Sequence, residues 1–152
     1  MPGEENILLA ILGVVLYRSI MARRQIPFGL HLMLDAYNCD PNTLNDQNLV
    51  YNILDTLPEK IGMKKLMKPY VLFAEANDKR DPGGWSGFVM IQESHISIHT
   101  FIKRRFITAD VYSCKEFNTK IAIEYFKDIF KTKDIECSIE NRGKKYPNRN
   151  ID

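Results

Sequence analysis

Hydrophobic and polar residues alternate in several short segments of the chain, a pattern typical of half-buried β-strands. The segments are residues 30–36, 70–76, 87–92, 95–101, 106–112 and 135–140. Two other stretches, residues 43–60 and 115–131, repeat apolar positions every three or four residues and predict amphipathic helices. Several strands with two separated helices indicate an α+β sandwich, in which an antiparallel sheet carries its helices on one face.

Local signals mark where these elements begin and end. Asn42 or Thr43 can cap the first helix, and Gly62 is expected to end it. Residues 77–84 are rich in Asp, Pro and Gly and predict a loop. The basic run at residues 103–105 predicts a tight charged connection between two strands.

The N-terminus has the least defined role. An apolar run at residues 7–17 has acidic residues before it and arginines after it. It is shorter than the about 20 apolar residues that span a membrane, and its flanking charges are the reverse of those in a secretory signal peptide. A short packed helix, an interfacial anchor and an extension from a misassigned start codon all stay open. Residues 1–26 are therefore an extension of unknown role, and residues 27–152 form the expected domain.

The composition is that of one compact domain. Among 152 residues, 21 are Lys or Arg and 19 are Asp or Glu, and the resulting net charge of +2 gives no argument for nucleic-acid binding. Cys39, Cys114 and Cys137 lie far apart, without CxxC or HxxxH spacing. We therefore expect no disulfide partner, no metal site and a reducing, cytoplasmic compartment. Cys39 and Cys137 are expected to be core residues, as lone cysteines usually are.

The segment at residues 93–100 carries the candidate chemistry. It places Ser94 between Glu93 and His95, and it repeats a histidine at His99 on the same face of the predicted strand. A serine hydroxyl beside a peptide carbonyl, with an imidazole further along the strand, suits attack of the hydroxyl on that carbonyl. The spacing alone favours a simpler interpretation, a polar turn entering a strand whose histidines face solvent.

Three longer segments change that interpretation. They are residues 86–100, residues 29–40 and residues 109–114. The first resembles the self-processing region of the bacterial and archaeal S-adenosylmethionine decarboxylases, the second their first strand, and the third the segment with their active-site cysteine. The likeness covers residues 27–147, in order and without large gaps. It implies the same α+β fold, assembled as a homodimer of self-cleaved protomers.

The resemblance further implies that the chain makes its own cofactor. Ser94 Oγ would attack the Glu93 carbonyl, the amide would become an ester, and elimination would split the chain into residues 1–93 and 94–152. The new N-terminal residue would become a pyruvoyl group, which forms a Schiff base with the substrate amine and acts as the electron sink for decarboxylation. No external cofactor and no metal is then required.

The resemblance also assigns roles to other side chains. His99 matches the processing histidine, Ser86 matches a serine that assists processing, and Cys114 matches the proton donor to the substrate Cα. For His95, shaping the turn and transferring a proton are equally open. These roles belong to the family motif and do not follow from residue spacing.

One position departs from the family pattern. After His-Thr the family commonly shows an aromatic residue and then Pro-Glu, whereas this chain has Phe101, Ile102 and Lys103. The missing glutamate typically accepts hydrogen bonds from the ribose hydroxyls of the substrate, and a lysine ammonium can only donate. The substrate-binding residues are therefore unknown.

The main hypothesis is an S-adenosylmethionine decarboxylase that supplies the aminopropyl donor for spermidine and other polyamines. A pyruvoyl-dependent arginine or ornithine decarboxylase is the alternative within the same chemistry. An alternative of another class is a non-catalytic regulatory subunit of a decarboxylase.

Overall fold

The computed structural model describes residues 27–77, 80–147 and 149–151. Residues 28–142 form one compact unit, and the residues from Gly143 onward belong to a second, separate unit. The apolar run at residues 7–17 lies outside the described residues. The fold and the candidate site below concern the compact unit.

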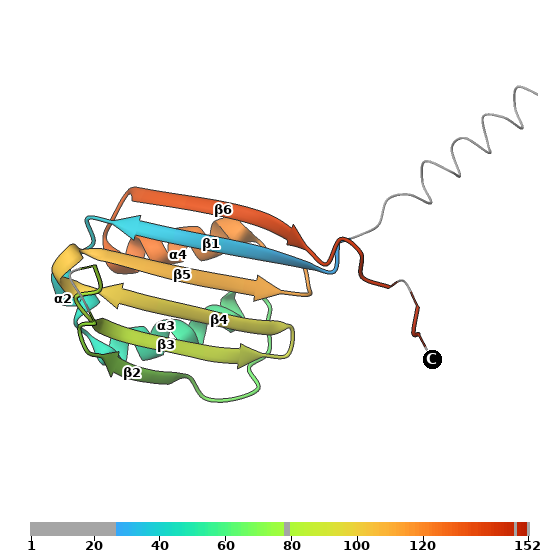
Figure 1. The fold of residues 1–152 in the computed structure, drawn as a ribbon, viewed down its shortest axis with the longest axis horizontal. Coiled ribbons are helices and arrows are strands. Elements are labelled where there is room, and N and C mark those ends of the chain that lie inside the picture. The colour runs from blue at the N-terminus through green and yellow to red at the C-terminus, as the bar shows by residue number, and fades with distance from the viewer. Residues whose placement is uncertain (1–26, 78–79, 148, 152) are drawn as a thin grey trace, which may run out of the picture. The chain divides into compact units, whose positions relative to one another are not determined.

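A six-stranded antiparallel sheet, in the order β2-β3-β4-β5-β1-β6, is the centre of this unit (Figure 1). The strands are β1 (Gly29–Tyr37), β2 (Tyr70–Ala74), β3 (Gly84–Ile91), β4 (Ser94–Phe101), β5 (Phe106–Ser113) and β6 (Asp134–Arg142). Each of the strands expected from the alternating pattern is present, with ends shifted by a few residues. The predicted antiparallel sheet is confirmed.

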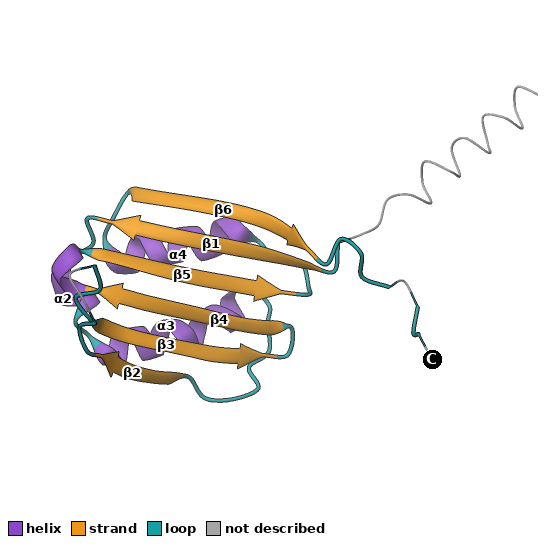
Figure 2. Ribbon diagram, in the orientation of Figure 1, coloured by secondary structure: helices purple, strands orange, loops and turns teal. Residues whose placement is uncertain are grey.

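The helices lie on one face of the sheet (Figure 2). They are α2 (Pro41–Leu44), α3 (Gln47–Lys60) and α4 (Thr119–Phe130), with a short 3-10 turn, η1 (Ile102–Arg104), between β4 and β5. Helix α3 packs mainly against β3, and α4 packs against β1. The predicted α+β sandwich is confirmed, and the other face of the sheet has no helix of the described chain on it.

Apolar side chains at alternate strand positions fill the layer between the sheet and the helices. Every second residue of each central strand is buried, and the large side chains of α3 and α4 cover them. The fully buried large residues are Leu32, Leu34, Leu44, Ile53, Leu54, Leu57, Ile91, Ile96, Ile98, Ile107, Phe126 and Phe130. The remaining strand residues point to the open face, so His95 and His99, at alternate positions of β4, lie there.

The prediction of one continuous helix over residues 43–60 was wrong, because this part of the chain forms two helices, α2 and α3. Asp40 caps α2 and Asp46 caps α3, each accepting a hydrogen bond from a backbone N–H in the first turn. A new cap at Asp46 interrupts the apolar pattern that had suggested one helix from residues 42–43 onward. Gly62 ends α3 as expected, with a φ of +75° that an L side chain would strain.

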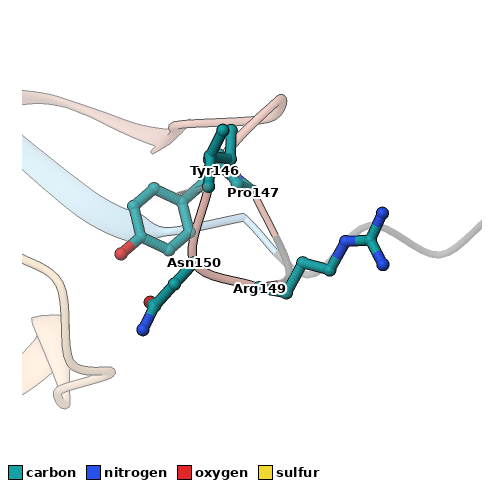
Figure 3. A pocket seen from close by; sticks show the side chains of 5 residues that line it. Tyr146, Pro147, Arg149 and Asn150 are labelled. Atoms are coloured by element: carbon teal, nitrogen blue, oxygen red, sulfur yellow. The ribbon is translucent and has the colours of Figure 1, made fainter.

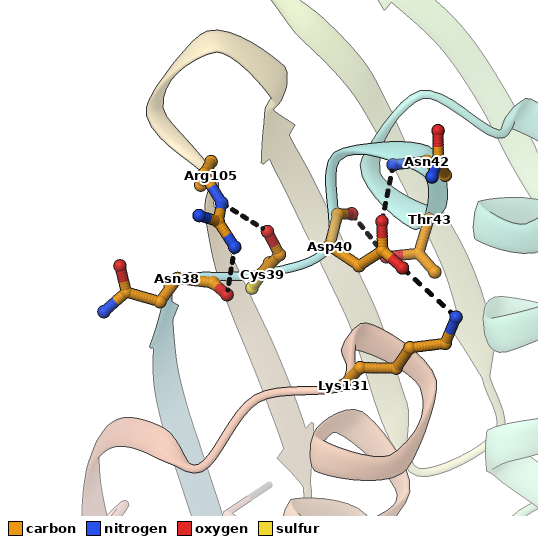
Figure 4. Close-up of polar contacts among 7 residues, drawn as sticks. All are labelled: Asn38, Cys39, Asp40, Asn42, Thr43, Arg105 and Lys131. Atoms are coloured by element: carbon orange, nitrogen blue, oxygen red, sulfur yellow. Dashed lines mark hydrogen bonds and ion pairs between the residues drawn. The ribbon is translucent and has the colours of Figure 1, made fainter.

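The connection between β4 and β5 is tied to the end of β1 by Arg105 (Figure 4). Arg105 has a left-handed backbone, φ +52°. Its Nε donates to the Cys39 carbonyl at 2.9 Å and its Nη2 to the Asn38 carbonyl at 3.1 Å. The Cys39 N–H donates back to the Arg105 carbonyl at 3.0 Å. These three bonds define where η1, and with it Lys103, lies.

Asp40 continues the same network toward the helices (Figure 4). Its carboxylate accepts the Asn42 N–H at 3.0 Å and the Lys131 ammonium at 3.1 Å. The hydrogen bond from the Asn42 N–H, and to a lesser extent the one from Lys131, holds the pKa of this half-buried carboxyl below its usual value. The Thr43 hydroxyl donates to the Asp40 carbonyl at 2.8 Å. The end of β1, α2 and the end of α4 are thereby joined.

Replacing Arg105 separates backbone strain from hydrogen bonding. Arg105→Ala is expected to lower the free energy of unfolding by about 1–2 kcal/mol, because two charge-assisted bonds are lost while the left-handed backbone stays. Arg105→Gly loses the same bonds but relieves the backbone, so its loss should be smaller. Urea unfolding of both variants measures this difference. Equal losses of unfolding free energy would show that the left-handed backbone at Arg105 is not strained.

Candidate active site

The turn between β3 and β4 carries the Glu93–Ser94 peptide bond. β3 ends at Ile91 and β4 begins at Ser94, so Gln92 and Glu93 form a two-residue turn. Ser94 has φ +155°. A non-glycine residue in such a sparsely populated region is strained by about 1–3 kcal/mol. The strained residue directly follows the peptide bond that the sequence motif indicates for cleavage.

The carbonyl of this bond is held by the end of β5. Ser94 pairs with Ser113 in the β4–β5 register, and the next residue, Cys114, donates its backbone N–H to the Glu93 carbonyl at 2.9 Å. A fixed N–H at this distance polarises the carbonyl and stabilises negative charge that develops on its oxygen. On the other side of the turn, the Lys64 N–H donates to Glu93 Oε2 at 3.3 Å.

The nearest imidazole to the Ser94 hydroxyl is that of the next residue. Ser94 Oγ lies 3.1 Å from His95 Nδ1, within hydrogen-bond distance, and both side chains are half-buried. A nucleophilic hydroxyl, a base and a polarised carbonyl are therefore present together at the turn. The hydroxyl and the base come from β4, the carbonyl from the turn before it, and the polarising N–H from the residue after β5.

Ser86 and His99 form a second pair on the open face of the sheet. They are directly opposite in the β3–β4 register, and His99 Nδ1 lies 2.9 Å from Ser86 Oγ. The pair is part of a shallow, mostly apolar hollow, which is lined by Tyr70, Leu72, Ser86, Gly87, Phe88, Ser97 and His99. The two residues that the motif associates with processing are thus in contact with each other.

The pair is not in contact with Ser94. His99 lies five residues further along β4. Five residues of extended strand span about 16 Å, well beyond proton-transfer distance. The structure therefore brings the predicted site residues together as two groups, Glu93, Ser94 and Cys114 in one and Ser86 and His99 in the other.

Comparison with known proteins places this geometry in a family. The sequence model described as S-adenosylmethionine decarboxylase matches residues 30–143. The chain belongs to this family. It is 33% identical over 116 residues to the S-adenosylmethionine decarboxylase proenzyme of Pyrococcus furiosus, covering 76% of this chain and 78% of that protein. With the proenzyme of Clostridium botulinum it shares 30% identity over 117 residues, covering 76% and 95%.

A solved structure agrees with the S-adenosylmethionine decarboxylase assignment. The crystal structure of the adenosylmethionine decarboxylase from Aquifex aeolicus resembles this fold with a TM-score of 0.64 and 26% sequence identity. The likeness covers 77% of this chain and 92% of that one. The family expectation from the three sequence segments is confirmed.

The expected core positions of Cys39 and Cys137 are partly borne out. Cys39 is buried as expected, and burial raises the pKa of its thiol to about 11. Cys137 is exposed, so its expected place in the core was wrong, because β6 is an edge strand that the helices leave largely uncovered. Cys114 is also exposed, directly after β5 and beside the Glu93–Ser94 turn.

Lys103, the departure from the family pattern, lies in η1 and is exposed. This turn follows β4, so Lys103 lies at the His99 end of the strand and not at the Ser94 end. The position at which the family commonly has glutamate therefore lies near the Ser86–His99 pair.

Sequence reasoning did not identify the Cys114 N–H as a functional group. A backbone donor has no residue-type signal, and its direction follows from the pairing of β4 with β5. The one sequence feature that pointed to this region was the predicted end of a strand close to Cys114. The strain at Ser94 had no sequence signal.

Other parts of the described chain contribute little to this site. No cluster of His, Cys, Asp and Glu side chains suited to a metal occurs among the described residues. In the same residues, no helix has both the length and the apolar character needed to cross a membrane. The C-terminal unit lines a hollow of its own with Tyr146, Pro147, Arg149, Asn150 and Ile151 (Figure 3). It includes none of the predicted site residues.

Thiol labelling tests the three cysteine environments. At pH 8 a thiol reagent should modify Cys114 and Cys137 quickly, and Cys39 slowly, because a buried thiol with a raised pKa is rarely ionised. Cys39 should react in denaturant. Peptide mapping by mass spectrometry measures the three sites separately, and rapid labelling of Cys39 in the folded protein would contradict its burial.

Proposed function

We propose that the chain is a self-processing, pyruvoyl-dependent S-adenosylmethionine decarboxylase that supplies polyamine synthesis, including that of spermidine. One observation carries the proposal: the strained Ser94 directly follows a carbonyl, Glu93 C=O, that accepts the Cys114 N–H. Membership of the decarboxylase family supports the same chemistry. A turn that served only to join two strands would need neither feature.

The first step is an acyl shift at the turn. The Ser94 hydroxyl gives up its proton, and Oγ bonds to the Glu93 carbonyl carbon. The carbonyl oxygen becomes an oxyanion, which the Cys114 N–H stabilises. When the oxyanion collapses, the C–N bond breaks and the Ser94 nitrogen takes up a proton. The product is an ester between Glu93 and Ser94 Oγ, and the backbone strain at Ser94 is relieved.

Elimination from this ester cuts the chain. A base removes the Ser94 Cα proton, and the Cβ–Oγ bond breaks to release the Glu93 carboxylate. The resulting dehydroalanine tautomerises to an imine, which takes up water and loses ammonia to give the pyruvoyl group at position 94. The atoms balance with one water consumed and one ammonia released.

A pyruvoyl group at position 94 would supply a ketone that serves as the electron sink for decarboxylation of a substrate amine. Cys114 has its exposed thiol beside the same turn. This position suits the role that the family motif gives it, donation of a proton to the substrate Cα. The residues present therefore fit a self-generated pyruvoyl cofactor.

A second copy of the chain completes the site in this proposal. Ser86 and His99 lie about 16 Å from Ser94 in the same chain, yet the family motif links all three to processing. A two-fold axis that places the partner's His99 near Ser94 also places His99 near the partner's Ser94, because such interfaces are reciprocal. Two equivalent sites per dimer result.

The open face of the sheet suits such a partner. It exposes several large apolar side chains, of which Tyr70 (55% of its surface), Leu72 (44%) and Phe88 (41%) line the hollow of the Ser86–His99 pair. Met90, 42% exposed, lies further along β3, opposite His95. An apolar patch of this kind on one side of a sheet is typical of an interface. We infer a homodimer with the two open faces in contact.

The alternatives have less support. The family match and the names of the relatives favour S-adenosylmethionine over arginine or ornithine. Lys103 does not distinguish them, because its charge disfavours a sulfonium and a basic amino acid alike. A group other than Lys103 then binds the ribose. A regulatory subunit would not require the Glu93–Ser94–Cys114 arrangement.

Intact-mass spectrometry of the purified protein tests self-processing. We expect two fragments, residues 1–93 and 94–152, the second lighter than its sequence mass by one ammonia. Ser94→Ala should stay a single chain, whereas Ser138→Ala, a matched change on the edge strand β6, should be cut normally. A wild-type chain that stays uncut on prolonged incubation would contradict the proposal and favour a regulatory subunit.

The same preparations identify the substrate. The processed protein should release labelled carbon dioxide from S-adenosylmethionine, and Ser94→Ala should release none. Carbon dioxide release from arginine or ornithine alone would contradict S-adenosylmethionine as the substrate, but it would not contradict self-processing.

Co-expression of two inactive variants tests the shared site. Ser94→Ala and His99→Ala should each stay uncut when expressed alone. In mixed dimers, the intact Ser94 of one chain meets the intact His99 of the other, so up to half of the His99→Ala chains should be cut when assembly is random. Separate affinity tags distinguish the two chains by mass. A mixture that stays uncut would contradict a site shared between protomers.

A further inference from the structure

His95 occupies a position that the family motif leaves without a role. The motif assigns processing to His99, but His99 bonds to Ser86 at 2.9 Å and lies about 16 Å along the strand from the reacting serine. His95 Nδ1 lies 3.1 Å from Ser94 Oγ, the atom that must lose a proton in the first step. Of the three histidines, His95 is the one in contact with the nucleophile.

A ring on the neighbouring strand holds His95 in this orientation. His95 and Tyr112 are directly opposite in the β4–β5 register. Their rings meet edge to face, with centroids 5.9 Å apart and an interplanar angle of 67°. Edge-to-face contacts of this kind stabilise one relative orientation of two rings. Tyr112 thereby limits the rotation that would turn Nδ1 away from Ser94.

Tyr112 is itself held from several sides. The Arg142 guanidinium lies 4.4 Å from the centre of its ring, in a cation–π contact. The His31 ring lies 5.5 Å away, and His31 Nε2 is 2.8 Å from Asp110 Oδ1. Residues from β1 and β6 therefore converge on this one tyrosine of β5.

The backbone of β1 leaves room for this ring. A Cβ at Gly29 would lie 2.9 Å from Tyr112 Cε2 and 2.7 Å from the Ser113 carbonyl oxygen. Both distances are shorter than side chains tolerate, so the glycine permits the Tyr112 ring to lie across β1. The arrangement is thus specified at several positions and is not a chance contact of one surface ring.

We propose that His95 is the catalytic base of the acyl shift and that Tyr112 is its positioning residue. The proposal rests on the self-processing function above. His95 Nδ1 takes the Ser94 hydroxyl proton as Oγ bonds to the Glu93 carbonyl carbon. The same proton passes from Nδ1 to the Ser94 nitrogen as the C–N bond breaks. His95 ends the step in its starting form, and no other reactant is needed.

In this assignment His95 and His99 act in different steps of processing. His95 acts on the amide before any cut, at a site that one protomer provides by itself. His99 and Ser86 are then needed for the later steps on the ester. Loss of His95 should therefore stop the chain as an intact amide, before an ester forms.

Processing kinetics of purified precursor test this prediction. His95→Ala should slow the appearance of the two fragments by about 100-fold or more, the usual contribution of a positioned base. Hydroxylamine cleaves an ester at Glu93–Ser94 but leaves the amide intact, so the slowed variant should resist it. Added imidazole should restore part of the rate, which a purely structural defect would not allow.

Tyr112 is tested by comparison of two variants. Tyr112→Ala should slow processing and leave a hydroxylamine-resistant chain. Tyr112→Phe keeps the ring and should be processed at the wild-type rate. Tyr125→Ala, a change in the helix layer where Tyr125 bonds to Thr56, is the matched control and should process like the wild type. Thermal unfolding of each variant reports whether it is folded.

The possible results separate this inference from the proposed function. If the wild type is cut and His95→Ala is cut equally fast, the role of His95 is overturned while self-processing stands. Accumulation of a hydroxylamine-sensitive ester in His95→Ala would also overturn it, because the acyl shift would then proceed without the base. A wild-type chain that is never cut would overturn both.

Discussion

The hydrogen bond from the Cys114 N–H to the Glu93 carbonyl depends on the pairing of β4 with β5, and the proposed chemistry at the turn depends on that bond. In this register Ser94 lies opposite Ser113, so Cys114, the first residue beyond β5, reaches the Glu93 carbonyl directly before β4. A shift of the register by one residue would exchange the faces of β4 and remove the donor from the carbonyl. The buried Ile96 and Ile98 oppose such a shift, because it would turn them toward the open face.

The position of the proposed cut explains how the protein can lose a peptide bond and keep its fold. The Glu93–Ser94 bond lies at the turn, outside the ladder that pairs β3 with β4 from Ser86 to Ile91. Ladder hydrogen bonds and the apolar layer beneath them do not require that covalent link. After cleavage, β4 would still lie between β3 and β5 in the centre of the sheet.

The two faces of the sheet have separate tasks in this protein. The face toward α3 and α4 is filled with aliphatic and aromatic side chains and stabilises the fold. The open face carries the Ser86–His99 pair, the ring cluster around Tyr112 and a patch of exposed apolar residues. Because side chains alternate along a strand, one sequence segment can serve both purposes, with Ile96 and Ile98 in the core and His95 and His99 on the open face. Arg105, bonded to the end of β1, holds the Lys103 turn at the edge of this face.

The sequence by itself determined the strands, the α+β class and the family, because alternation and motif identity are local properties of the chain. It misjudged features that depend on distant partners. The cap at Asp46 divided a predicted helix, and Cys137, expected in the core, is exposed on an edge strand. Only the tertiary structure showed that His95, Tyr112 and Arg142 meet, and that the Cys114 N–H reaches the Glu93 carbonyl. The register of strands that are distant in sequence decides these contacts, and no short-range pattern specifies it.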